Sequence, residues 1–137
     1  MAAPVSIAAA VLATFLAQPL SAGGIASCRP LDTRLTPQRT SEYAQLVADA
    51  LVAKVRPQEV KVRRFMRSGA WSAVNVSTPV SDDGVMFFRL DGKHQQYKGV
   101  WGGWATPDDR AQLIAWAHGI GAPTALAHCF ADSAISR

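Results

Sequence analysis

The sequence has no charge at its start and no long hydrophobic run. The first charged residue is Arg29, and the apolar stretch from Ile7 to Leu16 is about half as long as a transmembrane helix needs. Such a length is typical of the apolar core of a secretory signal, although the Lys or Arg that usually precedes that core is absent. Small residues after Pro19 suit a signal-peptidase site. We therefore expect residues 1–24 to be a secretory signal peptide and the protein to be exported to the periplasm or the extracellular space.

Cysteine is scarce, since Cys28 and Cys129 are the only two. Residues 25–28 resemble the bacterial lipobox, in which such a cysteine is lipidated and anchors the protein to a membrane. Pro19 and a pair of glycines separate this cysteine from the apolar core, however, and lipidation would leave Cys129 as an unpaired thiol. Two cysteines in an exported chain more simply form one disulfide. We predict the disulfide Cys28–Cys129, with lipidation at Cys28 as the alternative.

The usual signatures of catalysis and metal binding are also missing. The sequence contains no HExxH, CxxC or His-x-His pattern, no phosphate-binding glycine loop and no GxSxG motif. His128 and Cys129 are adjacent, but neighbours on a helix point about 100° apart and do not face each other. We therefore expect no metal site, no cofactor and no enzyme built on Cys129. One enzymatic alternative remains, in which Asp82, Asp83 and His94 meet at one end of a sheet.

Positive charge is present and unevenly distributed. The net charge is +4, and several basic residues fall within a short segment. The core of this basic patch consists of Lys61, Arg63, Arg64 and Arg67. Such a patch can attract anionic lipid headgroups, cell-wall polymers or an acidic protein, or it can simply keep an edge strand soluble. Nothing else in the sequence indicates nucleic-acid binding.

The periodicity of apolar residues predicts an α+β fold. Residues 40–55 have helical spacing, and the period then changes to two over residues 60–66, 71–77, 85–90 and 95–104. The short turns between these segments include Asp91-Gly92 and indicate a four-stranded antiparallel meander. A helix should follow from Thr106 to about His118, and a last short helix should start near Pro123.

These elements define a single domain. We expect residues 25–38 to form an extended N-terminal segment and residues 39–137 to form the domain, in which the N-terminal helix packs on the sheet and two short C-terminal helices follow. One face of the sheet should meet the helix, and the other should meet solvent or a partner.

Two tryptophans in the last predicted strand are candidates for binding. Alternation places Trp101 and Trp104 on opposite faces, unless a bulge at Gly102-Gly103 shifts the register. One of the two indoles should then lie on the outer side of the sheet. Because tryptophan is usually highly buried, however, packing of both indoles, one in the main core and one under the C-terminal helices, is favoured over exposure. The candidate binding residues are Trp101, Trp104, Tyr97 and Trp71.

The sequence therefore favours a small exported binding or accessory module over an enzyme. Its partner would be a protein or a cell-envelope component, as for an inhibitor, an immunity-type protein or an envelope-associated factor. A membrane is expected as partner only if Cys28 is lipidated. The alternative function is a small envelope hydrolase or ligand-binding domain.

Overall fold

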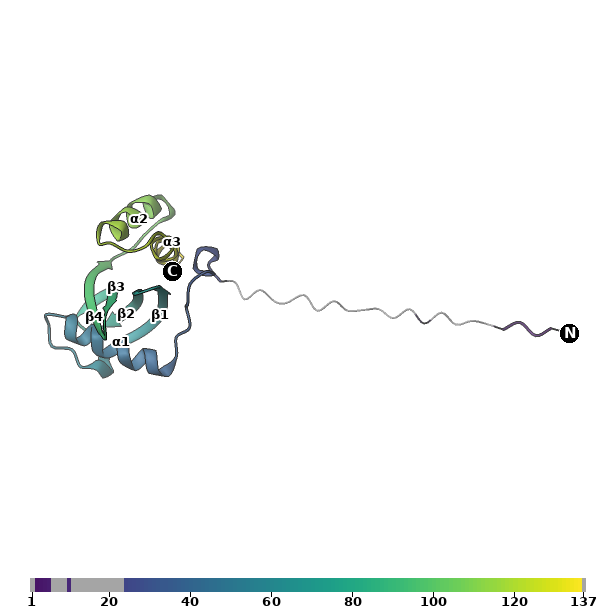
Figure 1. Cartoon of the computed structure of the whole chain (residues 1–137), viewed down its shortest axis with the longest axis horizontal. Helices are drawn as coiled ribbons and strands as arrows, with labels where there is room; N and C mark the ends of the chain where they lie inside the picture. Colours follow the sequence, from purple (N-terminus) through teal and green to yellow (C-terminus); the bar gives the residue numbers. More distant parts are fainter. Residues whose placement is uncertain (1, 6–9, 11–23, 137) are drawn as a thin grey trace.

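A computed structural model describes residues 2–5, 10 and 24–136 of the chain (Figure 1). The predicted signal peptide therefore lies almost entirely outside the described residues, and the structure does not test it. Among the residues described, the fold consists of one helix, four strands and two further helices, in the predicted order. The α+β class is confirmed.

The sheet is an antiparallel meander in which neighbours in sequence are neighbours in space, in the order β1-β2-β3-β4. The strands are β1 (Lys61–Ser68), β2 (Trp71–Thr78), β3 (Ser81–Asp91) and β4 (His94–Gly102). The helices are α1 (Pro37–Ala50), α2 (Arg110–Gly119) and α3 (Thr124–Ile135). Three single 3-10 turns accompany them: η1 (Ala26–Cys28), η2 (Pro57–Glu59) and η3 (Pro107–Asp109).

Helix α1 is displaced towards the N-terminus relative to the prediction of 40–55. Thr36 is its N-cap, because the Thr36 hydroxyl accepts a hydrogen bond from the Arg39 backbone N–H at 3.1 Å. Pro37 occupies the first helical position, where the missing N–H costs nothing. The helix ends when Leu51 adopts an extended conformation, before the predicted end at Val55. The predicted extended segment 25–38 is accordingly shorter, and it includes the turn η1.

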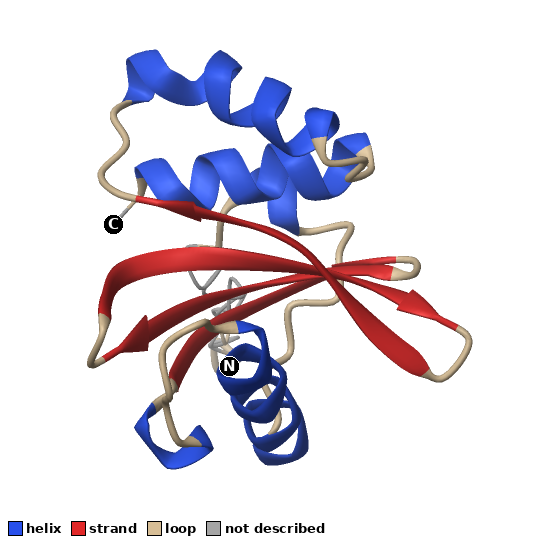
Figure 2. Cartoon of the chain, turned by 90° about the vertical axis from the view of Figure 1, so that its left-hand side faces the viewer, coloured by secondary structure: helices blue, strands red, loops and turns tan. Residues whose placement is uncertain are grey.

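Helices cover both faces of the sheet, which corrects the expectation of one open face. Helix α1 lies on one side, and α2 and α3 lie on the other (Figure 2). The four consecutive residues Val85 to Phe88 of β3 are all buried because their side chains alternate between the two cores. Val85 and Phe87 join the α2/α3 core, whereas Met86 and Phe88 join the α1 core.

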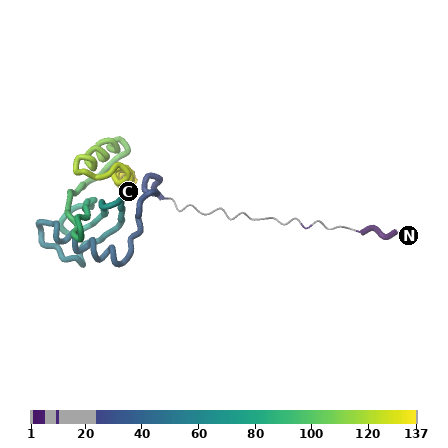
Figure 3. The backbone as a smooth tube through the Cα atoms, viewed as in Figure 1, coloured from purple at the N-terminus to yellow at the C-terminus, as the bar shows by residue number. Residues whose placement is uncertain are grey.

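The N-terminal segment is attached to α3 and to the edge of the sheet. The predicted disulfide Cys28–Cys129 is confirmed, with the two Cα atoms 4.7 Å apart. Asp32 adds one antiparallel bridge to Arg67 of β1. The backbone path in Figure 3 shows this segment beside the C-terminal helix. Since the Cys28 sulfur is part of this bond, lipidation at Cys28 would require the bond to be absent.

A β-bulge changes the faces that the residues of β4 occupy. Phe87 of β3 is opposite Gly99, and the next residue, Phe88, is opposite Tyr97, so Lys98 is the extra residue. Tyr97 therefore lies on the α1 side with Phe88, whereas Trp101 lies on the α2/α3 side. Strict alternation would place Tyr97 and Trp101 on the same face, and the bulge prevents this.

Candidate functional site

A solvent-open cleft of about 820 Å³ lies at one end of the sheet. Strand β1 supplies two arginines, β2 supplies the floor, and β3 supplies two aspartates. The exposed indole of Trp104, just after β4, completes the rim. The lining residues are Arg63, Arg64, Asn75, Val76, Asp82, Asp83, Gly84, Gly103 and Trp104. Groups that the sequence analysis singled out separately thus come together here.

The charges of the cleft are separated by sign. Arg63 and Arg64 belong to β1, and Asp82 and Asp83 belong to β3, with β2 between them. Among residues 24–136, none of these four side chains forms an ion pair. The Arg64 guanidinium donates a hydrogen bond to the Ser133 hydroxyl of α3 at 2.8 Å, which fixes its position. The cleft therefore presents a cationic wall and an anionic wall.

Asn75 lies on the strand between these two walls. Its side chain is 8 % exposed, and its amide oxygen is buried without a hydrogen-bond partner among the described residues. An unpaired buried polar group costs about 1–3 kcal/mol, so it is rarely kept without a reason. Asn75 is not among the binding residues predicted from the sequence. The sequence feature that could have identified it is a polar residue between two valines in the middle of a predicted strand.

Trp104 separates this cleft from a second, smaller hollow of about 220 Å³. The second hollow is lined by Trp101, Trp104, Asp109, Gln112, Leu113 and Trp116. Trp101 and Trp104 thus face the same hollow, which contradicts the prediction of opposite faces. The cause is that β4 ends at Gly102, and Gly103 has a φ of +109°, a conformation that favours glycine and breaks the alternation.

The two indoles differ in burial although they share this hollow. Trp101 packs against the α2/α3 core, with its ring edge-on to Phe130 at 5.9 Å between centroids. Trp104 is 90 % exposed. An exposed indole was the less favoured of the two alternatives, and its exposure results from the end of the strand and not from strand alternation. Trp116, which the sequence analysis did not consider, packs against Phe87 and Phe130.

The other two aromatic candidates lie elsewhere. Tyr97 is 43 % exposed on the α1 side, next to Phe88. Trp71 packs against the α2/α3 core and against Gly121, and the Lys98 ammonium lies 5.9 Å from the centre of its ring. Neither residue lines the cleft.

The basic patch divides between two places on the edge strand β1. Arg63 and Arg64 line the cleft, and Lys61 lies at the start of the strand. Arg67 lies towards the other end, where its side chain donates a hydrogen bond to the carbonyl of Gly69. All four side chains belong to exposed residues. Strand β1 is an edge strand of the sheet.

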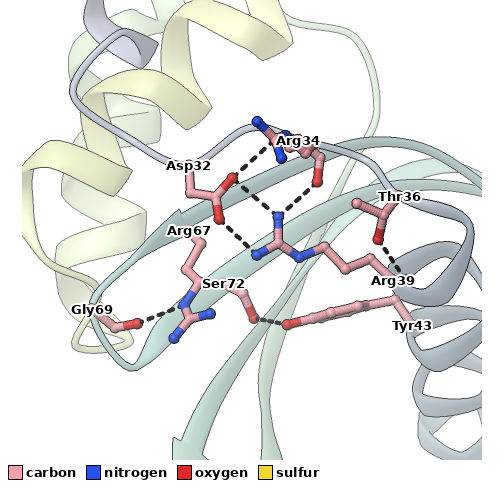
Figure 4. Close-up of polar contacts among 8 residues, drawn as sticks. All are labelled: Asp32, Arg34, Thr36, Arg39, Tyr43, Arg67, Gly69 and Ser72. Atoms are coloured by element: carbon pink, nitrogen blue, oxygen red, sulfur yellow. Dashed lines mark hydrogen bonds and ion pairs between the residues drawn. The ribbon is translucent and has the colours of Figure 1, made fainter.

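A polar network at the other end of the sheet has a structural role. Figure 4 shows Asp32 in a two-point contact with the Arg39 guanidinium, at 2.6 and 3.0 Å. The hydrogen bonds from Arg39 and from the Arg34 backbone lower the pKa of Asp32 to about 2. Nearby, the buried Tyr43 hydroxyl donates to Ser72 at 2.7 Å, and burial raises the pKa of Tyr43. These contacts join the N-terminal segment to α1 and α1 to the sheet.

The strand register contradicts the hypothesis of a hydrolase site built on Asp82, Asp83 and His94. His94 is opposite Asp91, at the far end of β3 from Asp83. At about 3.4 Å per residue, the two positions are about 27 Å apart along the strand, so the three side chains cannot act together. Within the described part of the chain, no group of three or more His, Cys, Asp or Glu side chains is arranged to hold a metal ion.

No family model, no curated protein and no solved structure matches the chain. Among the described residues, no helix is long and apolar enough to span a membrane.

Proposed function

We propose that this protein is a small exported binding module, without catalysis of its own, that holds a peptide or another cell-envelope component in the cleft beside Trp104. The observation that carries the proposal is the 90 % exposure of Trp104 at the rim of a cleft with charged walls. Tryptophan is usually among the most buried side chains and is enriched where proteins meet partners.

The energetics support a partner that covers this indole. A tryptophan buries about 150–250 Å² when it is enclosed, which at about 25 cal/mol per Å² corresponds to about 4–6 kcal/mol before the costs of association. The cleft volume of about 820 Å³ lies within the range of ligand sites, about 300–1,000 Å³. Charged walls on either side would orient what binds.

Export is part of the proposal and has its own support. Residues 4–22 have the composition of a secretory signal, and a disulfide such as Cys28–Cys129 is compatible with an oxidising compartment. Mass spectrometry of the protein purified from its natural host tests this directly. A mature chain that begins near residue 25 and carries the disulfide supports export, whereas an unprocessed N-terminus in the cytosol overturns it. A lipidated Cys28 at the N-terminus would replace the soluble form with the anchored alternative.

Retention of a partner from a cell-envelope extract tests the binding function. The immobilised wild-type protein and the Trp104→Ala variant are compared, with Tyr97→Ala as the matched control for an exposed aromatic residue outside the cleft. We expect a component that the wild type and Tyr97→Ala retain and that Trp104→Ala loses by about tenfold or more. Equal retention by all three folded proteins would remove the cleft from consideration.

A further inference from the structure

The spacing of the charged walls constrains the length of a ligand that touches both. The arginines of β1 and the aspartates of β3 are separated by β2, and adjacent strands are about 4.8 Å apart. The two backbones are therefore about 10 Å apart across the sheet. An extended peptide spans about 3.3–3.6 Å per residue, so about three residues bridge this distance.

Opposite charges on the two walls match the two ends of a free peptide. Arginine side chains bind carboxylates through paired hydrogen bonds, whereas aspartates accept hydrogen bonds from an ammonium group. Arg63 and Arg64 would hold the carboxylate, and Asp82 and Asp83 would hold the amino group. Because none of these four residues forms an ion pair with another described residue, their charges are available to a ligand.

Asn75 fits the middle of such a ligand. It lies on β2, opposite Arg64 of β1 and opposite Val85 of β3, two residues beyond Asp83, and among the described residues its amide oxygen has no hydrogen-bond partner. A carboxamide donates through its nitrogen and accepts through its oxygen, which complements the N–H and C=O of a peptide group. Rotation about χ2 exchanges the two ends of the amide, so either group can be turned towards the cleft.

We propose that the cleft binds a short peptide of about three residues with free amino and carboxyl ends, which crosses β2 with its carboxylate at Arg63–Arg64 and its ammonium at Asp82–Asp83. Asn75 pairs with a peptide group of the ligand, and the Trp104 indole covers one side of it. The inference rests on the proposed binding function, because it names the ligand of the same cleft.

Calorimetric titration of the mature protein with defined peptides tests the inference. The probes are trialanine with free ends, N-acetyl-trialanine, trialanine amide and the single amino acid alanine. We expect trialanine to bind at least about tenfold more tightly than each of the other three, because each of them loses a charge-assisted contact or cannot span the cleft. Equal affinity of the free and the blocked peptides, or no binding of trialanine, overturns the inference.

Variants assign each end of the peptide to its wall. Asp82→Asn with Asp83→Asn should weaken trialanine about tenfold and leave N-acetyl-trialanine unchanged, because the blocked peptide has no ammonium group to lose. Arg63→Gln should weaken trialanine about tenfold and leave trialanine amide unchanged, because the amide has no carboxylate to lose. This variant leaves the Arg64 contact to Ser133 intact. Arg89→Gln is the matched control, since Arg89 is an exposed arginine outside the cleft. Losses that do not depend on which end is blocked contradict the assignment.

The two proposals fail in different ways. If no peptide prefers free ends but Trp104→Ala still loses a component of the envelope extract, the binding function stands and the peptide inference falls. If Trp104→Ala loses no component of the envelope extract and trialanine does not bind the wild type, the cleft is not a binding site and both proposals fall.

Discussion

Trp101 and Trp104 line the same hollow, yet only Trp101 is part of the core. Trp101 packs edge-on against Phe130, whereas Trp104 is 90 % exposed because β4 ends at Gly102 and Gly103 redirects the chain. Two tryptophans three residues apart therefore have different environments, one packed in the core and one exposed at the rim of the cleft.

Alanine substitutions should distinguish these environments. We expect Trp101→Ala to lower the free energy of unfolding by about 2–3 kcal/mol, somewhat less than for a fully buried tryptophan, because it leaves a void beside Phe130. Trp104→Ala should change it by less than about 0.5 kcal/mol, since exposed side chains contribute little packing. Urea unfolding followed by far-UV circular dichroism measures both. A comparable loss in the two variants would mean that Trp104 is packed in solution.

Asn75→Leu should stabilise the protein. Leucine has the same branched shape and number of heavy atoms, its larger methyl groups can extend into the open cleft, and it removes a buried amide oxygen that has no partner among the described residues, so we expect the free energy of unfolding to rise by about 1 kcal/mol. The same variant should weaken ligand binding, because it removes a polar group from the cleft floor. Thermal unfolding and peptide titration of one sample test both outcomes. A marked loss of stability would show that the amide makes a structural hydrogen bond in solution.

The buried pair Tyr43–Ser72 should behave as a unit. Tyr43→Phe removes the donor of a 2.7 Å hydrogen bond and leaves the Ser72 hydroxyl unpaired, which should cost about 1–2 kcal/mol. The double variant Tyr43→Phe with Ser72→Ala should recover part of this loss, because no polar group is then left without a partner. Chemical unfolding of the wild type, the two single variants and the double variant gives the free energies of unfolding for a double-mutant cycle. Strictly additive losses would argue against direct coupling.

Stability should fall with pH in the acidic range because of Asp32. The hydrogen bond from Arg39 holds the pKa of Asp32 at about 2 in the folded protein, below its usual range in an unfolded chain. The depressed pKa contributes stability above about pH 4, and this contribution is lost as the pH falls from about 4 to about 2. The effect should be modest, since the Asp32 carboxylate is 45 % exposed and solvent screens the pair.

Melting temperatures between pH 5 and pH 2 measure this dependence. The Asp32→Asn variant should lose less stability than the wild type over this interval, because it has no carboxylate to protonate. Asp83→Asn is the matched control, since its carboxylate makes no hydrogen bond in the structure, and it should keep the wild-type slope. Asp132, whose pKa the Arg110 hydrogen bond also lowers, should contribute to the slope that remains in Asp32→Asn.

Removal of the disulfide should lower stability substantially. Cys28 and Cys129 are 101 residues apart, and closing a loop of this length stabilises by about 4.7 kcal/mol in the chain-entropy model. We expect the double variant Cys28→Ser with Cys129→Ser to lose about 2–5 kcal/mol in its free energy of unfolding. Addition of a reductant should lower the free energy of unfolding of the wild type by the same amount. Guanidinium unfolding with and without reductant tests this. No difference between the oxidised and the reduced protein would show that the bond does not form in solution.

The order and type of the elements could be predicted from the sequence because each has a strong local signal. The period of two along β2 and the Asp91-Gly92 turn are determined by neighbouring residues. The two C-terminal helices were predicted, but their packing on the second face of the sheet was not, although Val85 to Phe88 indicated it. A run of four apolar residues in a strand indicates burial on both faces, not on one.

The candidate site was harder to predict because its geometry depends on single backbone positions. The bulge at Lys98 and the positive φ of Gly103 determine which way Tyr97 and Trp104 face, and neither follows from alternation. The cleft also combines residues from β1, β2 and β3, so no linear motif describes it. Strand register, which sequence periodicity does not determine, brings Asn75 between the charged walls.

The bond between Cys28 and Cys129 has a further consequence for the integrity of the molecule. It makes nearly all of the described fold one covalent ring. A protease that cuts once within this ring, for example between α1 and β1, would leave both pieces joined. Such a nicked molecule would keep its mass apart from the added water and would separate into fragments only after reduction. The cleft residues 63 to 104 all lie inside the ring, so a single cut outside the cleft need not release any part of it.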